Sequence, residues 1–155
     1  MQRSQIINPV NLHVTSQTRI AIIASRFNHD IVDVLIKGAM DGLTQNGITQ
    51  NSISLYQVPG AFELPFLAQR LAPQYDGCIA LGAVIRGDTP HFEYVAGECA
   101  RGLMRVSLDT NKPVIFGVLT TDTLEQAQER AGTENNKGFD SALNLLEMIN
   151  LLNKI

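Results

Sequence analysis

Residues 77–95 read GCIALGAVIRGDTPHFEYV, and this stretch decides the fold. Its first part is a short apolar run typical of a buried strand, which we expect over residues 77–84. An amphipathic helix is expected over about residues 92–108. A polar loop joins the two, so the stretch has the strand–loop–helix order of an α/β unit.

The chain on either side repeats this alternation. Asp30 is expected to cap the first helix, and Thr123 is expected to cap another in a capping-box pattern with Gln126. The strands are apolar almost throughout, which favours a parallel sheet covered on both faces, with right-handed crossovers. Further strands are expected over residues 19–25, 52–58 and 113–120, and further helices over about 30–46, 63–71, 123–131 and 139–153.

Composition bounds the class of protein. The 155 residues, 45% hydrophobic and 17% charged, suit one globular domain over 1–155, with residues 1–18 as an arm ordered only against a partner. The net charge of −3 argues against a nucleic-acid or anionic-membrane partner. No signal-peptide core or membrane-length apolar run is present, so a cytoplasmic protein is expected. Cys78 and Cys99 are expected to be small core residues.

Loops that follow parallel strands meet at one edge of the sheet, where such folds bind ligands. His91 is the only histidine in these loops, and an imidazole suits proton transfer near neutral pH, although a plain surface histidine fits as well. Gly87 and Thr89, before a helix N-terminus, resemble a phosphate cradle. Asp88 would repel phosphate, so it could instead cap a turn or pair with Arg86.

The other loops carry aromatic and charged side chains. Phe27 and Phe62 could stack on a planar ligand, or each could close the core beneath its loop. Glu63 could bind ligand hydroxyls or favour the start of its helix. Arg130 and Lys137 could converge on an anion or stay solvated. No dinucleotide, Walker A, nucleophile-elbow or metal-ligand pattern is present, which favours chemistry without a cofactor or metal on a planar, phosphorylated or polyol-bearing substrate.

From about Arg19 onward the chain resembles the 6,7-dimethyl-8-ribityllumazine synthase family. The resemblance rests on SRFN, VPGAFELP, LGAVIRGDTPHFEYV, FGVLTTDTLEQAQERAGT and NKG, in order and spacing. It implies a three-layer α/β/α sandwich around a four-stranded parallel sheet in the flavodoxin-like order 2-1-3-4. It also implies a transferase of riboflavin biosynthesis that needs no cofactor. This enzyme condenses 5-amino-6-(D-ribitylamino)uracil with L-3,4-dihydroxy-2-butanone 4-phosphate and releases phosphate and water.

The resemblance also implies residue roles. His91 would be the proton donor. The phosphate would be held at Asp88, Thr89, Arg130 and Lys137. Phe116, which the pattern alone assigns to the core of its strand, would contact the pyrimidine. The full pyrimidine-binding set would be Phe27, Ala61, Phe62, Glu63, Ala83, Val84, Ile85 and Phe116.

The family's unit is a ring of five with each site between neighbours and the N-terminal arm added to a neighbour's sheet. Rings also pair or build icosahedral 60-subunit shells, and riboflavin synthase is a candidate partner. Two positions depart from the family: Asp88 replaces a small neutral residue, and ERAGTENNKG is one residue shorter than the usual segment, which bears on shell formation. Two other classes remain as alternatives: a non-catalytic binding or shell-forming protein, and a flavodoxin-like binding or signalling domain.

Overall fold

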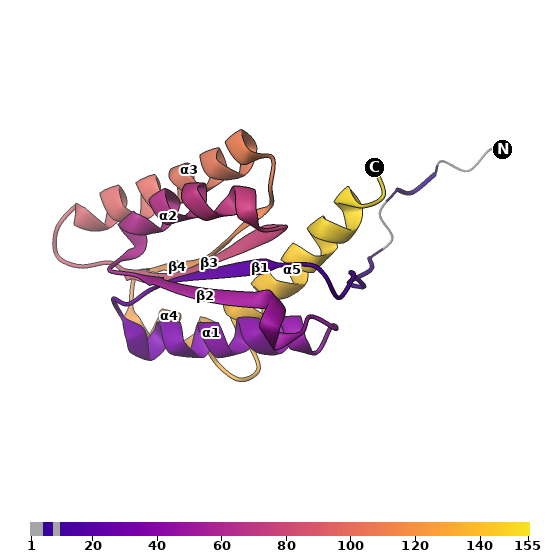
Figure 1. The fold of residues 1–155 in the computed structure, drawn as a ribbon. Coiled ribbons are helices and arrows are strands. Elements are labelled where there is room, and N and C mark those ends of the chain that lie inside the picture. The colour runs from indigo at the N-terminus through magenta and orange to yellow at the C-terminus, as the bar shows by residue number, and fades with distance from the viewer. Residues whose placement is uncertain (1–4, 8–9) are drawn as a thin grey trace.

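The computed structural model describes residues 5–7 and 10–155 (Figure 1). Four strands form one sheet in the order β2-β1-β3-β4, and each neighbouring pair is parallel. The expected sheet and its 2-1-3-4 order are therefore confirmed. The strands are β1 (Ile20–Ser25), β2 (Ile53–Val58), β3 (Gly77–Ile85) and β4 (Val114–Thr121).

Helices cover both faces of this sheet. Figure 1 shows α2 and α3 on one face and α1 and α4 on the other, and α5 packs against α1. The connections between the described elements contain the short 3₁₀ turns η1 (Gln50–Ser52), η2 (Ala61–Glu63) and η3 (Ala72–Gln74). The helices are α1 (His29–Thr44), α2 (Leu64–Leu71), α3 (His91–Thr110), α4 (Leu124–Arg130) and α5 (Lys137–Leu152).

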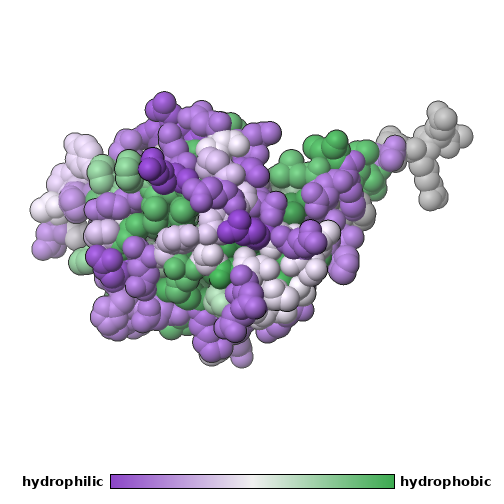
Figure 2. All heavy atoms as spheres, viewed as in Figure 1, coloured by the Kyte–Doolittle hydropathy of each residue, from purple (hydrophilic) through white to green (hydrophobic). Residues whose placement is uncertain are grey.

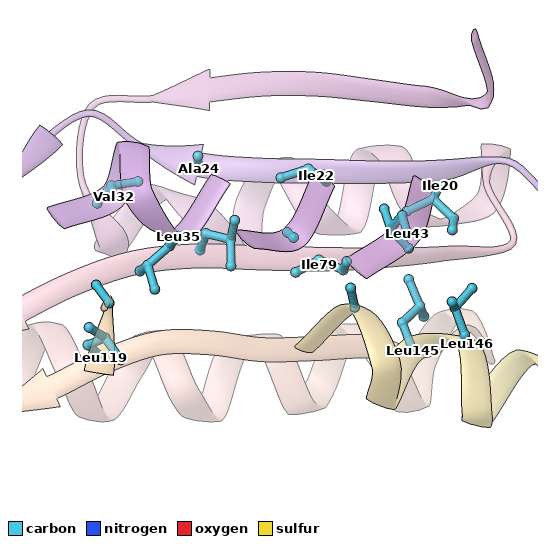
Figure 3. Close-up of a cluster of buried hydrophobic side chains, with 14 of the residues drawn as sticks. Ile20, Ile22, Ala24, Val32, Leu35, Leu43, Ile79, Leu119, Leu145 and Leu146 are labelled. Atoms are coloured by element: carbon cyan, nitrogen blue, oxygen red, sulfur yellow. The ribbon is translucent and has the colours of Figure 1, made fainter. Parts of the chain in front are cut away.

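The central strand β1 contributes side chains to two hydrophobic cores, one on each face of the sheet. Ile20 and Ile22 point to the side of α1 and α5, while Ala21 and Ile23 point to the side of α2 and α3. All four side chains are fully buried, because alternate residues of a strand face opposite sides of a sheet that is covered twice. Figure 3 shows the first of these cores, where side chains of α1 and α5 meet those of the sheet.

Glycines allow α5 to approach α1 closely. A Cβ on Gly138 would lie 2.0 Å from the carbonyl oxygen of Leu35, and a Cβ on Gly42 would lie 2.8 Å from Cβ of Ala142. The close approach buries Leu35 and Leu145 completely in the shared core (Figure 3). Burial of each such leucine stabilises the fold by roughly 1.5–3 kcal/mol.

Of the two helix N-caps predicted from the sequence, one is confirmed and one is wrong. The Thr123 hydroxyl accepts from the Gln126 N–H at 3.1 Å, so that predicted cap is confirmed. Asp30 does not cap α1. It lies in the first turn, and the cap is Asn28, whose left-handed backbone (φ 61°, ψ 42°) directs its side chain elsewhere.

The segment before β1 contains no strand or helix at residues 5–7 and 10–19. Its last part is anchored, since Val14 and Thr18 are buried, whereas Val10 is 81% exposed. The rest of the expected arm, residues 1–4 and 8–9, lies outside the described residues. Figure 2 shows apolar surface between the helical layers, where β2 crosses the front in Figure 1. β2 is an edge strand and leaves Leu55 half-exposed, so this edge has room for another strand.

Both cysteines lie in the core between the sheet and α3, as expected from their apolar neighbours. Burial raises the pKa of the Cys78 thiol to about 12 and that of Cys99 to the same value. Within residues 5–7 and 10–155, no helix is long and apolar enough to span a membrane.

Candidate active site

The loops after β1, β2 and β3 surround an open cavity of about 740 Å³. We call it the aromatic cavity, because four aromatic rings line it. It lies where the strands end, as expected for a parallel sheet. Its lining is Phe27, Pro59, Gly60, Ala61, Phe62, Glu63, Ala83, Val84, Ile85, Gly87, Thr89, His91, Phe92, Tyr94 and Val95.

Hydrogen bonds join the three loops behind this cavity. The Asn28 side-chain amide donates to the Ala83 carbonyl at 2.8 Å, which ties the end of β1 to the end of β3. The Phe27 N–H donates to the Pro59 carbonyl at 3.1 Å, and the Arg26 N–H donates to the Val58 carbonyl at 2.8 Å. The backbone behind Phe27 is therefore fixed on both sides.

The aromatic side chains at the mouth are exposed. Phe27 is 71% exposed and Phe62 is 59% exposed, and both line the cavity. The alternative in which each ring closes the core under its loop is therefore wrong. Exposed ring faces on a fixed backbone can stack on a planar ligand. Glu63 ends the 3₁₀ turn η2 beside Phe62 and lines the same cavity.

His91 is the first residue of α3 and lies at the cavity wall. Its backbone N–H donates to the Thr89 hydroxyl at 3.4 Å, a long contact within the loop before the helix. Tyr94 and Val95, one helical turn further on, line the same wall. Neither residue is among the site residues predicted from the sequence, although positions three and four residues after a candidate site residue on a helix share its face.

Asp88 does not pair with Arg86, so that alternative is wrong. Asp88 is exposed and lines neither cavity, and it forms no ion pair among the described residues. Arg86 instead pairs with Glu93 and with Asp122. The hydrogen bond to Asp122 raises the Arg86 pKa most, and the hydrogen bond to Glu93 raises it further. The hydrogen bond from Arg86 lowers the pKa of the Glu93 carboxyl.

A second cavity, of about 450 Å³, lies along β4. We call it the cationic cavity, because Arg130 and Lys137 both line it. Arg130 ends α4 and donates to the Gln126 carbonyl at 2.9 Å. Lys137 begins α5 directly after Asn136, whose side chain caps the helix by accepting from the Phe139 N–H at 3.1 Å. The full lining is Phe116, Val118, Leu119, Thr120, Thr121, Arg130, Asn135, Lys137 and Asp140.

Phe116 is not a core residue, contrary to the pattern reading. It is 38% exposed and lines the cationic cavity. The physical reason is that, within the described part of the chain, β4 pairs only with β3 and is an edge strand. Its apolar sequence looks like that of a central strand, but its position at the edge of the sheet leaves Phe116 partly exposed.

The two cavities share no lining residue, so the predicted site residues fall into two groups within one chain. Asp88 belongs to neither. The aromatic cavity collects Phe27, Ala61, Phe62, Glu63, Ala83, Val84, Ile85, Thr89 and His91, and the cationic cavity collects Phe116, Arg130 and Lys137. No group of three or more His, Cys, Asp or Glu side chains suited to a metal occurs among the described residues.

The match to a known family spans nearly the whole fold. The family model for 6,7-dimethyl-8-ribityllumazine synthase matches residues 17–153 of the 155-residue chain. That span begins just before β1 and ends just after α5, so it includes every strand and both cavities. The chain is therefore a member of the 6,7-dimethyl-8-ribityllumazine synthase family, a family of transferases in riboflavin biosynthesis.

Proposed function

We propose that this chain condenses 5-amino-6-(D-ribitylamino)uracil with L-3,4-dihydroxy-2-butanone 4-phosphate, the penultimate step of riboflavin biosynthesis. The single observation that carries the proposal is the aromatic cavity, because Phe27, Glu63 and His91 all line it. A planar pyrimidine with a polyol side chain matches this set of groups in shape and polarity.

The pyrimidine would lie against Phe27, whose exposed ring offers a stacking face. Backbone groups of Ala83, Val84 and Ile85 would contact its edge, and Ala61 and Phe62 would close the other side. Glu63 would accept hydrogen bonds from ribityl hydroxyls. Binding of both substrates in one cavity would hold the amine against the ketone, which removes much of the entropic cost of a bimolecular reaction.

His91 would move protons as the imine forms and as phosphate leaves, because an imidazole both gains and loses a proton near neutral pH. The departing phosphate needs positive charge and hydrogen-bond donors. Thr89 and the backbone N–H of Asp88 would supply donors in the loop before α3. The Asp88 carboxylate would point away from the phosphate, in keeping with its exposed position.

The cations of Arg130 and Lys137, with the Phe116 ring, would come from the neighbouring subunit. Their separation from the aromatic cavity within one chain supports a site completed by a second copy. Large exposed apolar side chains on α2 and α3, including Phe66, Tyr94 and Leu108, supply surface for contact between copies. We propose a ring of five, with larger assemblies and riboflavin synthase as further partners, and the N-terminal arm pairing with a neighbour's sheet.

The direct test mixes the purified protein with both substrates and follows lumazine fluorescence above the uncatalysed rate. His91→Ala should slow turnover modestly, because proximity still operates, whereas Arg130→Ala should mainly raise KM for the butanone phosphate. No acceleration by a folded oligomer would leave a pyrimidine- or flavin-binding scaffold. An unchanged KM in Arg130→Ala would remove the phosphate assignment.

The shared site has a sharper test. Phe27→Ala/His91→Ala chains keep an intact cationic cavity, and Arg130→Ala chains keep an intact aromatic cavity. The two variants are unfolded, mixed in equal amounts and reassembled. Up to about a quarter of the sites should then be active, because in that fraction an intact aromatic cavity from one variant meets an intact cationic cavity from the other. Each variant reassembled alone is the control. No regain in mixed oligomers of the correct size would place the whole site within one chain.

A further inference from the structure

The guanidinium group of Arg86 is held by three neighbours. Its Nε donates to Oδ1 of Asp122 at 2.8 Å, and its Nη1 donates to Oε1 of Glu93. Its central carbon lies 4.3 Å from the centre of the Phe92 ring, in cation–π contact. Two edges and one face of the guanidinium group are therefore occupied by side chains of this chain.

The partners of Arg86 come from different elements. Phe92 and Glu93 lie in the first turn of α3, and Asp122 directly follows β4. Backbone contacts reinforce the link to β4: the Arg86 N–H donates to the Thr121 carbonyl at 2.8 Å. The Asp122 N–H in turn donates to Oε1 of Gln126 at 2.8 Å, so Asp122 is itself fixed on α4. Arg86 thus joins the end of β3 to the start of α3 and to the end of β4.

The loop that Arg86 spans, residues 86–90, has few other restraints. Its interior hydrogen bond, from the His91 N–H to the Thr89 hydroxyl, is long at 3.4 Å. A Cβ at Gly87 would meet no atom within 4 Å, and Asp88 has no ion-pair partner among the described residues. The shape of the loop that carries Thr89 and His91 therefore depends on how its two ends are held.

The same contacts argue against Arg86 as an anion ligand. Two carboxylates already offset its charge, and Nε and Nη1 already donate to carboxylate oxygens. A planar group with several fixed donors is suited to bridge two carboxylates and stack on a ring, whereas a lysine ammonium can do neither in the same way.

We propose that Arg86 is a positioning residue, which sets the shape of the 86–90 loop by holding Glu93 and Asp122 and does not contact substrate. Its effect on turnover rests on the proposed function, whereas its effect on the loop does not. The proposal predicts that loss of charge at any one of the three ion-paired residues, Arg86, Glu93 or Asp122, has the same consequence. Loop order decreases, and Thr89 and His91 leave their bound geometry.

The test measures hydrogen exchange of the peptide spanning residues 86–95, together with steady-state kinetics, in the assembled protein. Arg86→Gln, Glu93→Gln and Asp122→Asn should each raise the exchange rate of this peptide about threefold or more. The exchange rate of this peptide in Arg86→Lys should lie between that of the wild type and that of Arg86→Gln. Lys37→Gln is the matched control, since it removes one cation from an exposed ion pair with Asp41 on the opposite layer.

The kinetic arm distinguishes positioning from binding by the sign of the effect. A positioning role predicts that kcat/KM for the butanone phosphate falls about tenfold in Arg86→Gln and falls also in Glu93→Gln and Asp122→Asn. A ligand role predicts a loss in Arg86→Gln but a lower KM when either carboxylate is removed, because the cation is freed. Unchanged exchange in all three variants would overturn the proposal. If the wild type shows no turnover, the proposed function fails, and the exchange data still decide the role of Arg86.

Discussion

Asn28 donates its side-chain amide to the carbonyl oxygen of Ala83 across 2.8 Å, while its own backbone takes the left-handed conformation at φ 61°. The hydrogen bond joins two strand ends at the aromatic cavity. The left-handed backbone conformation lets the chain turn directly from Phe27 into α1. One residue therefore meets two separate requirements, and substitutions can remove them one at a time.

Asn28→Gly keeps the backbone conformation and loses the amide, whereas Asn28→Ala loses both. We expect Asn28→Gly to raise KM for the pyrimidine substrate about threefold to tenfold, because the loop that carries Phe27 is no longer tied to Ala83 through the side chain of Asn28. Asn28→Ala should add a loss of unfolding free energy of about 1 kcal/mol. Kinetics and urea unfolding of both variants check this. Equal stability of the two variants would show that the left-handed backbone carries no strain.

Gly138→Ala should destabilise the protein, because a Cβ would lie 2.0 Å from the Leu35 carbonyl oxygen. The clash is with backbone, so α5 must move away from α1, at a cost of about 1–3 kcal/mol or more. Because Lys137 is the preceding residue, KM for the butanone phosphate should rise too. Thermal unfolding and kinetics measure the two effects.

The matched control is Gly132→Ala in the segment before α5, where the nearest contact of a Cβ would be 3.6 Å. It should change stability by no more than about 0.5 kcal/mol. If Gly138→Ala behaved in the same way, α1 and α5 would not be packed as closely as described.

Cys78 and Cys99 should not react with Ellman's reagent at pH 8 in the folded protein, because both are buried and their pKa values are about 12. In denaturant both should react at once. The same values predict a pH effect. Between the ordinary thiol value of 9.0 and about 12, the unfolded state has lost protons that the folded state retains, so stability falls as pH rises.

Urea unfolding at pH 8 and pH 10 tests that sign. Other groups titrate in the same range, so the control is the Cys78→Ala/Cys99→Ala variant. The wild type should lose about 1–3 kcal/mol more than this variant over the interval. An equal loss in both proteins would mean that the thiols are not desolvated in the fold.

The ring at Phe116 illustrates what the sequence could not predict. Periodicity identified all four strands, because each strand is an apolar run bounded by turn residues, and the order of layers followed from their alternation. Burial of one residue on β4 depends on which strand lies at the edge, which is a property of the whole sheet. The resemblance to a family assigned Phe116 to the pyrimidine site, and the structure places it in the cationic cavity.

Contacts made by long side chains also could not be predicted from the sequence. The sequence offered Asp88, two residues away, as a partner for Arg86, but the partners lie seven and thirty-six residues away in the chain. Local spacing does not reveal such pairs. The turn from β3 into α3 brings Glu93 to Arg86, and the pairing of β3 with β4 brings Asp122. The cap at Thr123 was predicted correctly, since its partner Gln126 lies within the same helical turn.

Tyr94 at the wall of the aromatic cavity has an optical consequence. The chain contains no tryptophan, so its near-ultraviolet emission comes from three tyrosines. Two of these, Tyr56 and Tyr75, are hydrogen-bonded to each other at 2.6 Å and line neither cavity. Tyr94 is the third, and it is 70% exposed. We therefore expect a ligand that enters the aromatic cavity to change the emission of Tyr94 alone among the three tyrosines, so that the intrinsic fluorescence of the unlabelled protein would report occupancy without a dye.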